Sequence, residues 1–115
     1  AKNQEIKQND LIYFIAKKDN IVKICSLLNK NSIYYITNVA ILGINSLTNE
    51  ILEKLTKKDL NIKVIEKDLN LCNKLLEKFQ DKITVINSKY NQKSVLKQEN
   101  IDEAHLVVST YENDE

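Results

Sequence analysis

Short runs of apolar residues alternate along this chain with segments in which apolar residues recur every three or four positions. The runs span residues 11–16, 39–42, 62–65, 83–86 and 105–109, and each has the length of a β-strand. Helical spacing occurs in residues 21–28, 47–55 and 69–79, and a shorter helical piece is predicted at 94–97. The third of these helices is marked by Leu69, Cys72, Leu75, Leu76 and Phe79. From residue 39 onward, this alternation predicts an α/β fold with a four-stranded parallel sheet and right-handed crossovers.

The strand and helix that come first in the chain are separated from this pattern by a polar stretch at residues 29–32. We therefore divide the chain into a strand-helix appendage at 1–32 and a main α/β unit at 33–115. The main unit ends just after its fourth strand, which is expected to leave apolar surface uncovered. We expect self-association, in which residues 11–28 dock on or exchange with a second copy.

The segment VAILGINSLTNEILEKL at residues 39–55 has the order strand, tight turn, helix of a nucleotide-binding unit. Such turns read G-x-G-x-x-G, and here only the first glycine, Gly43, is present, with Asn45 and Thr48 at the other two positions. Asn45 tolerates left-handed backbone, but its side chain is predicted to project where a pyrophosphate would lie. The helix N-terminus still favours a small anion. Ser46 either caps this helix or donates to the anion, and we favour capping.

An acidic residue stands at the end of the second strand of the main unit. Glu66 follows Gly43 at the distance where dinucleotide-binding units place the carboxylate that accepts the ribose hydroxyls. The alternative is a solvent-facing carboxylate beside Lys67, and the residues alone do not separate the two interpretations.

Composition and charge exclude several classes of function. The net charge is +1, so there is no electrostatic signal for nucleic acid or an anionic membrane. No apolar run approaches the roughly 18 residues of a membrane span, and the N-terminus lacks the apolar segment of a signal peptide. The two cysteines, Cys25 and Cys72, have no spacing typical of a metal site or a disulfide framework, and we expect no metal. We therefore expect a cytoplasmic protein that is not inserted in the membrane.

Four segments in order resemble the Trk-type potassium-uptake regulatory proteins (TrkA), which are built from RCK or KTN domains. IKQNDLIYFIAKKDNI is similar to the end of an RCK C-terminal subdomain, and NVAILGINSLTNEILEKL to the start of the Rossmann subdomain that follows. IKVIEKDLNLCNKLLEKF resembles the second strand and helix of that subdomain, and QENIDEAHLVVSTYENDE its fourth strand. The resemblance implies a Rossmann-like sheet in the order 3-2-1-4, truncated, with helices on both faces.

The resemblance also implies a function in regulation rather than catalysis. Members bind NAD(H) or adenine nucleotides, form dimers or rings, and act on a membrane K+ channel or transporter from its cytoplasmic side. The family's Gly-Asp-Ala segment after the third strand is replaced here by Asn87, Ser88 and Lys89. With Asn45 and Thr48, these departures predict a degenerate site in which nucleotide binding is weak or lost. Gly43, Asn45, Ser46, Glu66, Lys67 and Ser88 are the candidate cofactor-binding residues.

Two other functions are weighed against this one. A structural or assembly repeat without a ligand would have the same fold and the same departures from the glycine pattern. Half of an NAD-dependent oxidoreductase is disfavoured, since no catalytic Cys-His or Ser-His-Asp set and no substrate domain is recognised. We therefore predict that the chain is not an enzyme.

Overall fold

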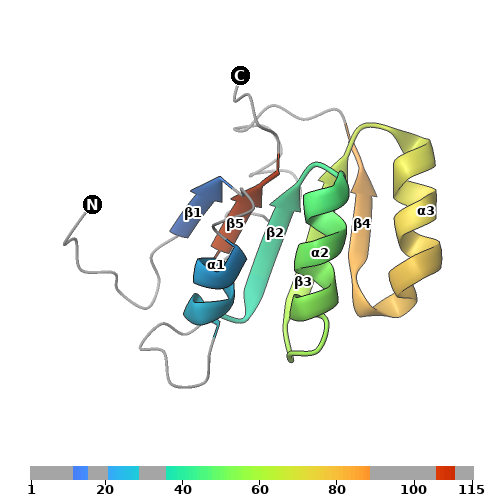
Figure 1. The fold of residues 1–115 in the computed structure, drawn as a ribbon. Coiled ribbons are helices and arrows are strands. Elements are labelled where there is room, and N and C mark those ends of the chain that lie inside the picture. Colours follow the sequence, from blue (N-terminus) through green and yellow to red (C-terminus); the bar gives the residue numbers. More distant parts are fainter. Residues whose placement is uncertain (1–11, 16–20, 29–35, 89–105, 111–115) are drawn as a thin grey trace.

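The computed structural model describes residues 12–15, 21–28, 36–88 and 106–110, and its elements follow the predicted alternation (Figure 1). The elements are β1 (Ile12–Ile15), α1 (Ile21–Leu27), β2 (Asn38–Leu42), α2 (Ser46–Leu55), β3 (Asn61–Glu66), α3 (Leu69–Phe79), a 3-10 turn (Gln80–Lys82), β4 (Thr84–Asn87) and β5 (Leu106–Ser109). The helical piece predicted at 94–97 lies outside the described residues.

The strands form one parallel sheet in the order β1-β5-β2-β3-β4. The register aligns Val39 with Ile62 of β3 on one side and with Leu106 of β5 on the other. Strands β4-β3-β2-β5 are the predicted order 3-2-1-4, which is therefore confirmed together with the parallel pairing.

The strand predicted in the appendage, β1, belongs to the same sheet. β1 pairs with β5 in parallel, with Ile12 opposite Leu106, and α1 packs in the main core through Ile21 and Ile24. These elements therefore extend and cover the sheet of their own chain. Their exchange with a second copy stays a prediction, as does the domain boundary at residue 32.

The described helices lie on one face of the sheet (Figure 1). Buried residues of α1, α2 and α3 join the strand residues of that face, such as Ile41, Val64 and Val108, in one apolar cluster. The opposite face has a smaller cluster of Ala40, Leu42, Ile65 and Val107. A helix on that second face stays a prediction, because residues 89–105 lie outside the description.

The apolar residues that predicted α3 are not all buried in the structure. Cys72, Leu75 and Phe79 are buried, whereas Leu69 is 56% exposed and Leu76 is 38% exposed. At 100° per residue, Leu69 and Leu76 fall on the flank of α3 that points away from Leu75. Among the described strands, β4 is the edge of the sheet on this side. Apolar spacing alone does not distinguish this flank from the buried face.

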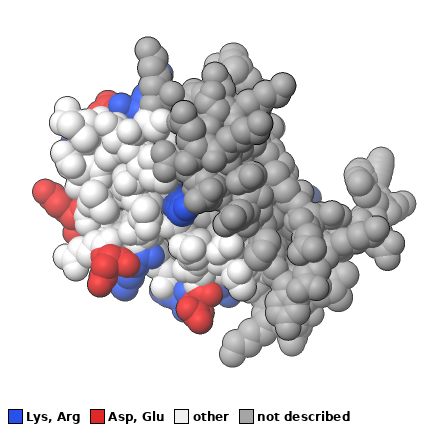
Figure 2. All heavy atoms as spheres, turned by 180° about the vertical axis from the view of Figure 1, so that it is seen from behind, with Lys and Arg blue, Asp and Glu red and all other residues white. Residues whose placement is uncertain are grey.

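The described surface shows no single-sign charge patch on its reverse side, where acidic and basic side chains lie near one another (Figure 2). Among the helices described, none is long and apolar enough to cross a membrane.

Candidate functional site

The carboxyl ends of β2 and β5 lie side by side at the point where the order in which strands are added to the sheet reverses. From β2 the chain proceeds to β3 and β4 on one side, whereas β5 lies on the other side of β2. Open parallel sheets bind ligands outside such a switch point. The predicted turn follows the carboxyl end of β2, and Glu66 stands at the carboxyl end of β3. Because the two strands are parallel, both lie at this edge of the sheet.

Gly43 makes the tight turn that the sequence predicted. Its φ angle is +99°, which glycine adopts without the steric penalty of a side chain. Its N–H donates to the Ile65 carbonyl at 2.9 Å, so the turn starts as a continuation of the β2–β3 ladder.

Asn45, not Ser46, caps α2. The Asn45 side-chain oxygen accepts from the N–H groups of Leu47 at 3.0 Å and Thr48 at 3.4 Å, and the Thr48 hydroxyl accepts the Asn45 N–H at 3.0 Å. This reciprocal arrangement is a capping box. Ser46 is the first residue of the helix and its side chain is exposed. The left-handed backbone considered for Asn45 is also not observed, because a cap residue is extended, here with φ −153°.

The Asn45 side chain also bridges to the end of β5. Its amide nitrogen donates to the Thr110 carbonyl oxygen at 2.8 Å. Thr110 is fully buried, its N–H donates to the Leu42 carbonyl at 3.0 Å, and its hydroxyl lies 3.1 Å from that oxygen and 3.0 Å from the Gly43 carbonyl. The switch point is therefore spanned by protein hydrogen bonds.

Thr48, at the third glycine position, fills this junction with a polar group. It is fully buried, and its hydroxyl donates to the Gly43 carbonyl at 2.7 Å. The hydroxyl oxygens of Thr48 and Thr110 are 3.4 Å apart. The side chain that Thr48 adds at the third glycine position is thus accommodated by hydrogen bonds that a glycine would not make.

Glu66 is buried, which excludes the solvent-facing alternative. The residue is only 2% exposed. One of its carboxylate oxygens accepts the Ile44 N–H at 2.8 Å, and the other accepts the Asp68 N–H at 2.9 Å. Lys67 beside it is exposed. The carboxylate thus joins the turn after β2 to the start of α3, and a ribose role for Glu66 stays a prediction.

The end of β4 is tied to the end of β3. Ser88 donates its N–H to the Glu66 carbonyl at 3.0 Å, and the Asn87 amide donates to the carbonyls of Glu66 at 3.1 Å and Lys67 at 3.0 Å. Asn87 also approaches the Cys72 sulfur at 3.9 Å. Burial raises the pKa of the Cys72 thiol; the Asn87 hydrogen bond opposes this, and the carboxylates of Glu66 and Asp68 add to it. Lys89 lies outside the described residues.

Most backbone donors of the turn are already engaged within the protein. Every backbone N–H from Gly43 to Thr48 except that of Ser46 donates to a protein acceptor, and Ser46 N–H has none among the described residues. A phosphate at this turn would meet the Asn45 side chain, which is engaged both in the cap and with Thr110. The described residues also include no cluster of His, Cys, Asp or Glu suited to a metal ion.

Sequence reasoning did not identify Thr110. Its role depends on β5 lying beside β2, which is a contact between distant parts of the chain. The available signal was indirect: two small hydroxyl residues, Ser109 and Thr110, follow the apolar run at 106–108, and another one, Thr48, replaces the third glycine.

Comparison with known families gives a match over more than half of the chain. The family described as the TrkA-N domain matches residues 39–115, which include β2 to β5 and the turn after β2. No curated protein matches the sequence.

Proposed function

The chain belongs to the TrkA-N domain family, whose fold is a Rossmann-like NAD-binding regulatory domain of K+ transport systems, and we propose that its own nucleotide site is degenerate. In this proposal the chain is a regulatory domain of a potassium-uptake system or K+ channel. It is cytoplasmic, works at the inner face of the membrane, and forms a homodimer.

The Asn45–Thr110 hydrogen bond is the observation that supports degeneracy most directly. A phosphate at the α2 N-terminus would compete with the Asn45 side chain for the N–H groups of Leu47 and Thr48. It would also have to release a buried network in which the Gly43 carbonyl accepts from two threonine hydroxyls. Each protein hydrogen bond lost is worth about 1 kcal/mol, so a nucleotide must first offset several of them.

The regulatory role then depends on association rather than on a ligand bound at this site. A nucleotide held by another domain would bias the conformations of the assembled regulator, provided that it binds two states unequally. The domain proposed here would transmit that bias to the membrane partner through its contacts.

A ligand-free structural or assembly repeat is the second candidate, and the same internal hydrogen bonds favour it. An NAD-dependent oxidoreductase half is the least supported alternative. Glycine substitutions in the turn distinguish the degenerate site from the structural repeat. A degenerate site should then recover some affinity for nucleotide, whereas a purely structural repeat should not.

Thermal unfolding with nucleotide tests the proposal. A ligand at about 100 times its Kd stabilises a fold by about 2.7 kcal/mol, which is on the order of several degrees in Tm for a domain of this size. We expect millimolar NADH, NAD or ATP to shift the Tm by less than that in the unmodified chain. Asn45→Gly, which frees the helix N-terminus, should increase the NADH shift, and Asn73→Gly on the exposed side of α3 should not.

Adding Thr48→Gly to Asn45→Gly should recover further binding, although the loss of the buried hydroxyl will lower stability. Micromolar NADH binding by the unmodified chain would contradict the degenerate site. No NADH shift in any of the glycine variants would favour the structural repeat.

A further inference from the structure

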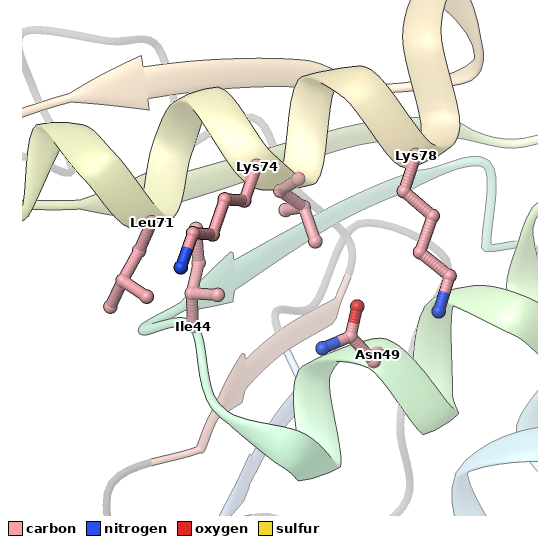
Figure 3. A pocket seen from close by; sticks show the side chains of 6 residues that line it. Ile44, Asn49, Leu71, Lys74 and Lys78 are labelled. Atoms are coloured by element: carbon pink, nitrogen blue, oxygen red, sulfur yellow. The ribbon is translucent and has the colours of Figure 1, made fainter.

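A hollow of about 250 Å3 lies between α2 and α3, on the helix-covered face of the sheet (Figure 3). Its lining is Ile44, Asn49, Leu71, Lys74, Leu75 and Lys78. Of these, only Ile44 belongs to the turn at the switch point, and that residue's N–H already donates to Glu66. The hollow is therefore a separate place from the one described above.

The hollow combines an apolar floor with a polar rim. Leu75 is 3% exposed and Ile44 is 8% exposed, and Leu71 completes the floor as a half-buried side chain. Asn49 contributes an amide from α2, on the opposite side from the two lysines of α3 (Figure 3). An apolar pocket with a few convergent polar groups is the usual form of a small-ligand site.

The two lysines on the rim differ in their partners. Lys78 forms an ion pair with Glu53 of α2 at 3.1 Å, and this pair links the two helices at one end of the hollow. Lys74 has no carboxylate partner within the described chain, and its side chain reaches toward Leu71 and Ile44 (Figure 3). Among the described residues, one positive charge without a carboxylate partner therefore lies beside the apolar floor.

We propose that this hollow binds a small carboxylate with an apolar body, the carboxylate on the Lys74 ammonium and the body against Ile44, Leu71 and Leu75. The volume corresponds to about eight water molecules and is smaller than the roughly 300–1,000 Å3 of drug-sized sites, which limits the ligand to about ten heavy atoms.

Octanoate, an alkyl carboxylate of suitable size, is the probe. Titrated into the 15N-labelled full chain, it should cause saturable amide shift changes centred on Ile44, Asn49 and residues 71–78, with a Kd of roughly millimolar order. Lys74→Glu should weaken binding about tenfold or more, because a charge-assisted contact is replaced by repulsion. Lys57→Glu, an exposed lysine outside the hollow, makes the same charge change and should leave the Kd unaltered.

Two further arms identify what is recognised. Octan-1-ol has a similar tail without the charge and should bind the unmodified chain more weakly than octanoate. In the Lys74→Glu variant, this difference in affinity between the two ligands should disappear. Octanoate shifts located elsewhere, or an equal loss of affinity in the Lys57 and Lys74 variants, would overturn the proposal. Binding of the acidic peptide acetyl-ELELE-amide to these residues without octanoate binding would overturn it in favour of a protein partner. None of these results depends on NADH binding, so the proposed function is tested separately.

Discussion

The side-chain amide of Asn45 donates to the backbone carbonyl of Thr110 at 2.8 Å and thereby joins the start of α2 to the end of β5. The same side chain caps α2 through its oxygen atom. One asparagine thus holds two elements that are distant in sequence, at the position where the family pattern has its second glycine.

Substitutions of Asn45 should separate the cap from the bridge. Asn45→Ala removes both and should lower the free energy of unfolding by about 1–2 kcal/mol. Asn45→Asp keeps the capping oxygen but loses the N–H donor to Thr110, and we expect a value between wild type and alanine. Urea unfolding measures each change, with the exposed Asn73→Ala as a control expected within about 0.5 kcal/mol of wild type.

The two buried threonines should show coupled energies. Thr48→Val and Thr110→Val each remove a hydroxyl that lies against the Gly43 carbonyl, and each should destabilise the chain by about 1–3 kcal/mol. Because both hydroxyls serve one acceptor and lie 3.4 Å apart, the double variant should differ from the sum by at least about 0.5 kcal/mol. Strict additivity in a double-mutant cycle would show that the two hydroxyls act independently.

Glu66→Gln should destabilise the fold although it conserves size. Both carboxylate oxygens accept a backbone N–H, and glutamine would place its NH2 group against one of these donors. A loss of about 1–3 kcal/mol is expected from chemical denaturation. The exposed Glu77→Gln on α3 is the matched control, and a similar loss there would refute a specific role for the Glu66 contacts.

Neighbouring leucines of α3 should respond very differently to truncation. Leu75 is 3% exposed and packs in the main core, whereas Leu76 is 38% exposed. Leu75→Ala should cost about 2–4 kcal/mol in the free energy of unfolding, and Leu76→Ala less than about 1 kcal/mol. Equal losses would mean that the two flanks of α3 are covered alike.

The thiol of Cys72 should make stability fall at alkaline pH. Its pKa is raised in the folded chain, first by burial, so the folded state retains the proton when the unfolded thiol has lost it. The contribution is full below the ordinary thiol pKa of about 8.5 and is lost as the pH rises toward the folded value. Denaturation between pH 7 and pH 10 should show a shallower decline in Cys72→Ala than in wild type, and identical slopes would count against the shift.

The pattern of apolar and polar residues predicted which strands and helices form better than it predicted where each of them begins. The run at residues 39–42 became β2 because an unbroken apolar segment suits a strand covered on both faces. The cap of α2 was misplaced by one residue, since asparagine and serine are equally good caps and only the partner at the third helical position decides between them.

Long-range contacts account for what the sequence did not predict. Thr110 and the buried position of Glu66 depend on which strands lie side by side, and local spacing carries no information about the second partner of a hydrogen bond. The pairing of β1 with β5 is a further long-range contact of this kind. Nothing in residues 12–15 indicates that they pair with a strand 90-odd positions further along the chain.

The place of β5 between β1 and β2 imposes an order on assembly. The β2-α2-β3-α3-β4 series can pair from neighbouring segments, whereas among the described strands β1 pairs only with β5 and must wait for it. Contacts so distant in sequence slow folding, because a long loop must close before they form. Among the described strands, β1 is therefore synthesised before its partner β5 and is the last to be paired.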